Sequence, residues 1–187
     1  MKHRIKRTYR IARYVIYRET LVDKKDIAWS FLGAFLGVGL IGFLNQYYLP
    51  VRDNLFVLGS FGASAVLIYG HTQSPLAQPR NLIGGHILSA ITGVTICMLI
   101  PWPEYEWLAG ALAVSFSIVV MQVTKTVHPP GGATALLAVA GSAKIRALGF
   151  LYVLSPVASG VFILLLIAFI VNNIPGHRSY PANGKWF

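Results

Sequence analysis

The sequence predicts an all-α polytopic membrane protein. We expect two pseudo-repeats, each a long helix, a short helix and a long helix, with the short (half-membrane) helices at the centre. The 187 residues are 55% hydrophobic and only 12% charged, whereas a typical soluble domain is roughly 25% charged. The apolar residues form long uninterrupted runs, and two shorter apolar segments resemble each other. Helices in lipid account for such runs, because a helix satisfies its own backbone where no water is present.

The chain begins with a basic segment, residues 1–26. Nine of the sixteen lysines and arginines lie in its first 25 residues, and apolar residues recur near helical spacing at Ile5, Tyr9, Ala12 and Ile16. This pattern is typical of an amphipathic helix on the inner surface of a membrane. Basic residues beside a span mark its cytoplasmic side, so we expect a cytoplasmic N-terminus in a bacterial inner (plasma) membrane. The net charge of +10 then indicates the lipid bilayer as a partner, and no nucleic acid.

Four apolar runs are long enough, or nearly so, to cross a bilayer, because a hydrocarbon core of ~30 Å requires about 20 helical residues. They cover residues 27–49, 82–102, 107–127 and 147–174, the last broken only by Pro156. These runs define a transmembrane domain, 27–174, with repeat one at 27–102 and repeat two at 107–174. Residues 175–187 form a C-terminal tail.

Two shorter apolar segments, 55–69 and 129–143, have 15 residues each, which as helix gives about 22 Å. The sequence "GASAVL" from Gly62 and the sequence "GATALL" from Gly132 share four of six residues at an offset of 70. We interpret this likeness as a duplication, whose halves are inverted if both short helices cross and parallel if both re-enter. Chance similarity is the alternative, because small residues are common wherever membrane helices pack.

The stretch "VHPPGGATALLAV" from Val127 predicts a broken helix. A residue before proline is disfavoured in the α region, so His128 and Pro129 should be extended and Pro130 should open the short helix. The amides of Gly131 and Gly132 would then face a ligand at a positive helix end, which favours a small anion. Alternatively, the prolines only end one helix and the glycines only allow tight packing.

Other polar residues join this candidate site. His128 could bind substrate, shuttle a proton or cap backbone carbonyls, and His86 lies inside an apolar run, where an ionisable residue is a functional candidate. Lys125 could raise the local potential or reach the interface. The repeat pairs Ser64 with Thr134. The predicted substrate-binding residues are Gly131, Gly132, His128, Pro130, Thr134, Gly62, Ser64, Ser60, His86 and Lys125.

The charge inventory favours an anion. Between Ile27 and Phe187 the carboxylates are Asp53, Glu104 and Glu106, all in predicted loops, whereas a cation carrier is expected to place acid in the membrane. Backbone amides, hydroxyls and imidazoles suit a small anion instead. The histidines lack HExxH spacing and Cys97 is alone, so we predict no catalytic residue, no metal ligand and no cofactor.

Three blocks of sequence resemble the HPP family of integral membrane proteins: "TVHPPGGATALLAV" from Thr126, "GSFGASAVLIYG" from Gly59 and "SPLAQPRNLIGGHILSA" from Ser74. The resemblance implies a compact helical membrane domain, usually described with four spans. It also implies transport of nitrite or a similar small anion, because the members with an assigned activity are nitrite transporters of chloroplasts and cyanobacteria. We therefore expect an anion transporter, not an enzyme. A membrane-embedded binding or regulatory module, or a membrane enzyme, is the alternative, and homo-oligomerisation stays open.

Overall fold

The computed structural model describes residues 23–48, 55–101 and 103–184, and within these ranges it contains helices and loops but no strand. The predicted all-helical fold class is therefore confirmed. The amphipathic helix predicted near the N-terminus falls outside the described residues, as do Asp53 and the last three residues of the tail.

Four helical segments are long and apolar enough to cross a membrane, counted over the described residues. They are α2 (Lys24–Tyr48), α4 (Pro79–Leu99), α5 (Glu106–Val123) and a segment that joins η3 (Val153–Ala158) to α8 (Ser159–Val171). The four predicted long helices are thus confirmed. Helix α4 begins at Pro79, earlier than predicted, and Gln78 before it is extended. Proline suits the first helical position because it has no N–H group that would need a partner there.

The last long segment is interrupted at Ser155, whose backbone is extended with φ −140° and ψ 121°. The next residue is Pro156, which disfavours the α conformation in the residue before it and has no N–H to donate. The predicted break at Pro156 is confirmed. Before the break, the chain passes through the short helix α7 (Ala143–Ala147).

Both predicted short elements are present. Helix α3 (Leu55–Ala65) continues directly as the π-helix η1 (Val66–Gly70), whereas α6 (Pro129–Ala140) has no such continuation. His128 is extended as predicted, with φ −138° and ψ 103°, but α6 begins at Pro129 and not at Pro130. The prediction for Pro129 was wrong because the first helical positions have no internal partner for an N–H group, so two successive prolines fit there.

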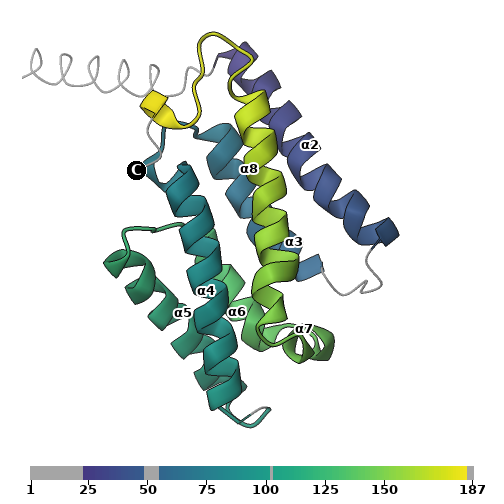
Figure 1. Ribbon diagram of the computed structural model, residues 1–187, viewed down its shortest axis with the longest axis vertical. Helices are drawn as coiled ribbons and strands as arrows, with labels where there is room; N and C mark the ends of the chain where they lie inside the picture. The colour runs from purple at the N-terminus through teal and green to yellow at the C-terminus, as the bar shows by residue number, and fades with distance from the viewer. Residues whose placement is uncertain (1–22, 49–54, 102, 185–187) are drawn as a thin grey trace, which may run out of the picture.

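Helix α4 occupies the middle of the molecule (Figure 1). It packs against α5 and α6 on one side and against η3 and α8 on the other, while α2 packs on α3 and α8. The short helices α3 and α6 contact each other. In Figure 1, α2 and α5 lie at opposite ends of the molecule and run in opposite directions. Helices α4 and α8, which are neighbours, also run in opposite directions.

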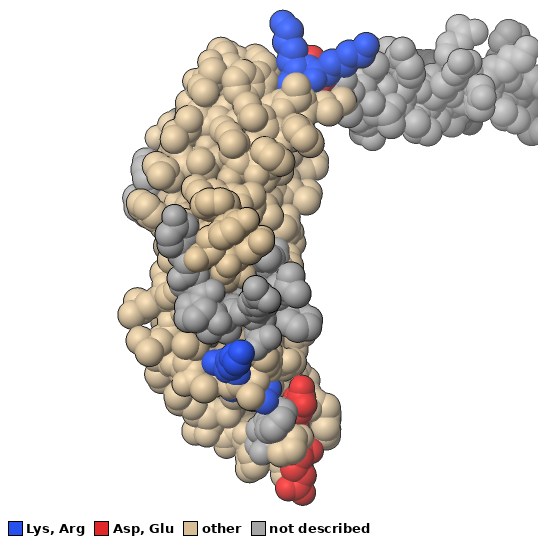
Figure 2. All heavy atoms as spheres, turned by 90° about the vertical axis from the view of Figure 1, so that its right-hand side faces the viewer, with Lys and Arg blue, Asp and Glu red and all other residues tan. Residues whose placement is uncertain are grey.

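The surface matches a bilayer environment. Large apolar side chains are exposed along the long helices, including Phe31 and Phe35 on α2 and Phe162 on α8. On the face shown in Figure 2, surface without charged side chains lies directly below the basic cluster at one end, a second group of basic side chains lies in the lower third, and acidic side chains lie beside it toward the opposite end. The membrane-spanning helices imply contact with the lipid bilayer, because water would not accommodate such a surface.

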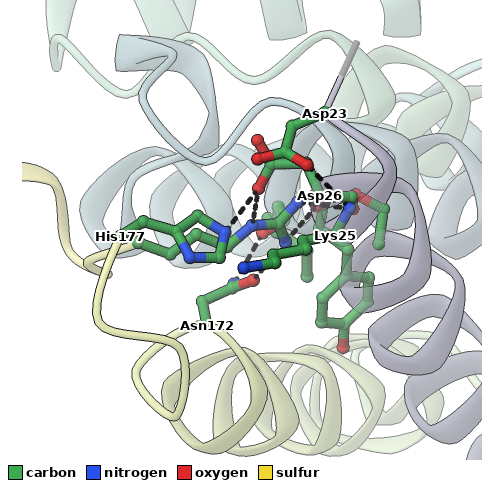
Figure 3. Close-up of polar contacts among 9 residues, drawn as sticks. Asp23, Lys25, Asp26, Asn172 and His177 are labelled. Atoms are coloured by element: carbon green, nitrogen blue, oxygen red, sulfur yellow. Dashed lines mark hydrogen bonds and ion pairs between the residues drawn. The ribbon is translucent and has the colours of Figure 1, made fainter.

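Arg178 ties the C-terminal segment to the start of α2 (Figure 3). Its guanidinium donates to the Asp26 carboxylate at 2.6 Å, to the Asp26 carbonyl at 2.7 Å and to the Ser30 hydroxyl at 3.0 Å. It also donates to the Tyr69 carbonyl and to the Asn172 side chain. The end of η1, the end of α8 and the start of α2 therefore meet at one buried guanidinium.

Candidate functional site

Four polar side chains meet in the core between the short helices α3 and α6 and the long helix α4. They are Ser64 on α3, His86 on α4, and His128 and Thr134 at the N-cap and in the body of α6, and each is fully buried. We call these four residues the polar cluster. All four belong to the predicted substrate-binding set, so the structure brings together residues that lie far apart in the sequence.

The polar cluster is held by short hydrogen bonds. The Ser64 hydroxyl oxygen lies 2.7 Å from His86 Nε2 and 2.8 Å from His128 Nε2. On the far side of His86, Nδ1 lies 2.7 Å from the Thr134 hydroxyl oxygen. On the far side of His128, Nδ1 lies 2.8 Å from the carbonyl oxygen of Leu76, in the short helix η2 (Pro75–Ala77). One serine hydroxyl therefore bridges two imidazoles.

The end of α5 explains how His128 reaches the core. Lys125 adopts a left-handed conformation with φ 55°, and the amide of Thr126 donates back to the Met121 carbonyl at 2.8 Å. This arrangement stops a helix and turns the chain. Two side chains at the start of α4 donate to carbonyls of this bend: Arg80 donates to the Thr124 carbonyl, and Asn81 donates to the Val127 carbonyl. His128 is thereby directed inward.

Glycines allow α4 and α6 to approach closely beside the polar cluster. A Cβ atom on Gly131 would lie 2.6 Å from the Gly85 carbonyl oxygen and 2.9 Å from the Ser89 hydroxyl oxygen. A Cβ atom on Gly85 would overlap the His128 side chain. Small residues permit such backbone contact between membrane helices.

Among the residues that the structure describes, one buried donor beside the polar cluster has no partner. The Ser89 hydroxyl, on α4 one turn after His86, is fully buried and makes no hydrogen bond in the part of the chain that the structure describes. A buried hydroxyl without a partner costs free energy, and such groups frequently mark a place where water or a polar solute binds.

The remaining predicted residues divide into two groups. Ser60 is buried one turn before Ser64, and its carbonyl lies 3.1 Å from the Ser64 hydroxyl. Pro130 is buried at the start of α6, and its carbonyl lies 3.3 Å from the Thr134 hydroxyl. Gly62 and Gly132 instead line apolar grooves on the outside of α3 and α6, and the Lys125 side chain is exposed.

The prediction of free glycine amides is wrong for Gly131. Its N–H donates to the His128 carbonyl at 2.8 Å, which closes the first turn of α6. Gly131 also packs against α4, so its lack of a side chain serves helix packing, the alternative that the sequence left open. Gly132 lies beside Val114 and Leu136, in a groove with apolar walls.

Sequence reasoning missed several residues around the polar cluster. Tyr152 donates its hydroxyl to the Thr134 carbonyl at 3.0 Å, Leu76 provides the carbonyl for His128, and Phe61 places its ring edge-to-face against His86. Ser89 follows His86 by three residues, so the two side chains share a face of α4, and this spacing could have identified Ser89 from the sequence. Nearby, Tyr180 donates its hydroxyl to the Ala77 carbonyl, and burial raises the pKa of that hydroxyl above its usual value.

The comparisons with known proteins agree with this fold. A family model described as the HPP transmembrane region matches residues 19–181. A transmembrane protein of Dictyostelium discoideum is 49% identical over 160 residues, which cover 85% of this chain and 51% of that protein. Another transmembrane protein of the same organism is 44% identical over 165 residues, which cover 88% of this chain and 58% of that protein.

The chain thus spans a little over half the length of these relatives. No solved structure matches it. The family model covers nearly all of the residues that form the helices and the polar cluster. This chain is a member of the HPP transmembrane family.

Proposed function

We propose that this protein transports a small inorganic anion across the membrane, with nitrite as the first substrate to test, and that the polar cluster is the site through which the anion passes. The observation that carries the proposal is the polar cluster itself. Its two imidazoles and two hydroxyls are fully buried between both short helices and α4. Polar groups at membrane depth are costly and frequently mark the path of a solute.

The chemistry of the polar cluster suits an anion. The carboxylates that the structure describes lie at the ends of long helices or in loops, as Asp23, Asp26, Glu104 and Glu106. Hydroxyl and imidazole N–H groups are hydrogen-bond donors to an anion, and a protonated imidazole adds positive charge. The Ser89 hydroxyl, which has no partner among the described residues, provides another donor beside them.

We propose further that the two halves are inverted repeats with the polar cluster near their interface. The opposite directions of α2 and α5, and of α4 and α8, support this arrangement. The two glycines that the sequence repeat pairs, Gly62 and Gly132, also support this arrangement. Gly62 lines a groove between α2 and α3, and Gly132 lines a groove between α5 and α6. Inverted repeats provide alternating access when one half rocks against the other around a central site.

The described conformation corresponds in this proposal to a closed state. The donors of the polar cluster bond to each other and are inaccessible, so an anion reaches them only when α3 separates from α4 and α6. The number of hydrogen bonds is conserved when the anion binds, because each internal bond that opens is replaced by a bond to the anion.

The test is uptake by the purified protein in proteoliposomes. We expect saturable uptake of nitrite above protein-free vesicles, with nitrate, formate and chloride measured in parallel to define the substrate class. Uptake of none of these anions would contradict the proposal. Saturable nitrite binding without uptake would favour the alternative of a membrane-embedded binding module.

A further inference from the structure

The hydrogen bonds of the polar cluster have a single consistent direction when both imidazoles are neutral. A carbonyl oxygen only accepts, so the nitrogen that faces Leu76, Nδ1 of His128, carries the proton. Nε2 of a neutral His128 is then an acceptor, and the Ser64 hydroxyl donates to it at 2.8 Å and not to the Ser60 carbonyl at 3.1 Å. The Ser64 oxygen therefore accepts from Nε2–H of His86, and Nδ1 of His86 accepts from the Thr134 hydroxyl.

The same atoms accommodate one additional proton without losing a partner. If Nδ1 of His86 is also protonated, it donates to the Thr134 oxygen, and the Thr134 hydroxyl turns to the Pro130 carbonyl at 3.3 Å. The positive charge then moves to His128 in one concerted step. The Nε2–H bond of His86 breaks as a bond to the Ser64 oxygen forms, and the Ser64 O–H bond breaks as a bond to Nε2 of His128 forms. Atoms and charge balance in both states.

From this geometry we propose that the polar cluster is a proton relay, and that the transported anion crosses together with a proton held by His86 and His128. This inference rests on the proposed function. It makes the proton the coupling ion, because an anion that crosses together with a proton is driven by an imposed proton gradient. A positive charge in the polar cluster also lowers the cost of bringing an anion into the low-dielectric core.

The surroundings of the polar cluster are consistent with a mobile proton. The elements packed against it contribute the neutral Tyr152 hydroxyl, which bonds to the Thr134 carbonyl, and the Phe61 ring against His86. Arg80 and Lys125 flank the turn before His128, and Arg80 donates to the Thr124 carbonyl. The described carboxylates lie at the ends of helices or in loops, away from the crossing of α3 with α6, so they do not hold the proton in place by pairing with it.

The experiment separates proton coupling from transport itself. Wild-type protein, Ser64→Ala and the control Ser117→Ala are reconstituted into proteoliposomes. Ser117 is an equally buried serine on α5, and its hydroxyl bonds only to the Val114 carbonyl of its own helix among the described residues. Three quantities are measured: exchange of labelled nitrite at equal pH on both sides, accumulation of nitrite with an acidic exterior, and acidification of the interior during that accumulation. Protein-free vesicles correct for the protonated acid, which crosses lipid unaided.

We expect nitrite exchange, accumulation and acidification in the wild type and in Ser117→Ala. In Ser64→Ala, nitrite exchange should fall as well, because Ser64 belongs to the proposed anion site, but gradient-driven accumulation should fall at least about tenfold further than exchange, because Ser64 no longer links the two imidazoles. Accumulation that falls only in proportion to exchange in Ser64→Ala, or wild-type exchange without nitrite-dependent acidification, overturns the relay and leaves the transport proposal standing. Absence of exchange in the wild type overturns the transport proposal. If Ser64→Ala neither folds nor exchanges, the wild-type ratio of protons to nitrite decides: a ratio near one supports the relay, and zero overturns it.

Discussion

The rings of His86 and His128 lie with their centroids 5.0 Å apart in the core of the molecule, joined through a single serine hydroxyl. They come from α4 and from the turn before α6, so their meeting depends on how the two helices pack. Two buried imidazoles that share one hydroxyl can bind a proton at either ring.

The shared hydroxyl predicts the tautomer of each ring. The neutral His128 should carry its proton on Nδ1, facing the Leu76 carbonyl, and the neutral His86 should carry its proton on Nε2, facing Ser64. Nitrogen NMR of protein labelled with ¹⁵N-histidine distinguishes the two tautomers. The exposed ring of His71 provides an internal reference. Finding Nε2–H on neutral His128 would remove the basis for the assigned direction of the hydrogen bonds.

Helix α6 should tolerate alanine at one of its two glycines and not at the other. In Gly131→Ala, the new methyl group meets the Gly85 carbonyl at 2.6 Å, and forced overpacking of this kind costs about 1–3 kcal/mol. In Gly132→Ala, the nearest atom outside the helix lies 3.8 Å away, so the better helix propensity of alanine should leave stability unchanged or raise it by up to about 1 kcal/mol.

Thermal unfolding in detergent measures this difference. We expect the melting temperature to fall only in Gly131→Ala. Equal melting temperatures for the two variants would show that α4 and α6 do not pack as closely as the structure describes.

The Arg178 contacts predict an asymmetry between two neighbouring residues of the C-terminal segment. Arg178→Ala removes hydrogen bonds from a largely buried guanidinium to α2 and η1, and should destabilise the fold by about 1–3 kcal/mol. His177→Ala removes a bond to Asp26 between two half-exposed side chains, and should cost less than about 0.5 kcal/mol. Unfolding of both variants in a denaturing detergent is the measurement. A similar loss of stability in both variants would mean that Arg178 does not hold the C-terminal segment to the start of α2.

Thr134 should stabilise the polar cluster through its hydroxyl. Thr134→Val keeps the shape but leaves Nδ1 of His86 without its donor, a loss of about 1–3 kcal/mol for a buried group. Thr92→Val on α4 is the matched control, because the Thr92 hydroxyl bonds to the Leu88 carbonyl of its own helix, and it should change stability by less than about 0.5 kcal/mol. Equal melting temperatures for the two variants would contradict the hydrogen bond between Thr134 and His86.

The sequence predicted the helices well, because each depends on local signals. Apolar runs gave the four long segments, and Pro129 and Pro156 marked the two breaks. It also selected all four members of the polar cluster as candidates, because hydroxyls and imidazoles are conspicuous in apolar segments. The duplication stays a prediction.

The connections inside the site were beyond the reach of sequence reasoning. Whether Ser64 bonds to one histidine or to two depends on how α3, α4 and α6 pack together, and the close approach of α4 and α6 depends on Gly85 and Gly131. The prediction of a free Gly131 amide was wrong because that amide closes the first turn of α6 on the His128 carbonyl. A glycine at a helix start has two uses, to expose an amide or to admit a neighbour, and the residue type alone does not distinguish them.

The most direct test of the central claim compares three histidine variants for nitrite uptake in proteoliposomes. His86→Gln and His128→Gln alter the polar cluster, whereas His71→Gln makes the same chemical change at an exposed position. We expect uptake to fall by at least about tenfold in the first two variants and to stay within about twofold of wild type in the third. Folded His86→Gln and His128→Gln proteins that take up nitrite at the wild-type rate would contradict the assignment of the polar cluster as the transport site.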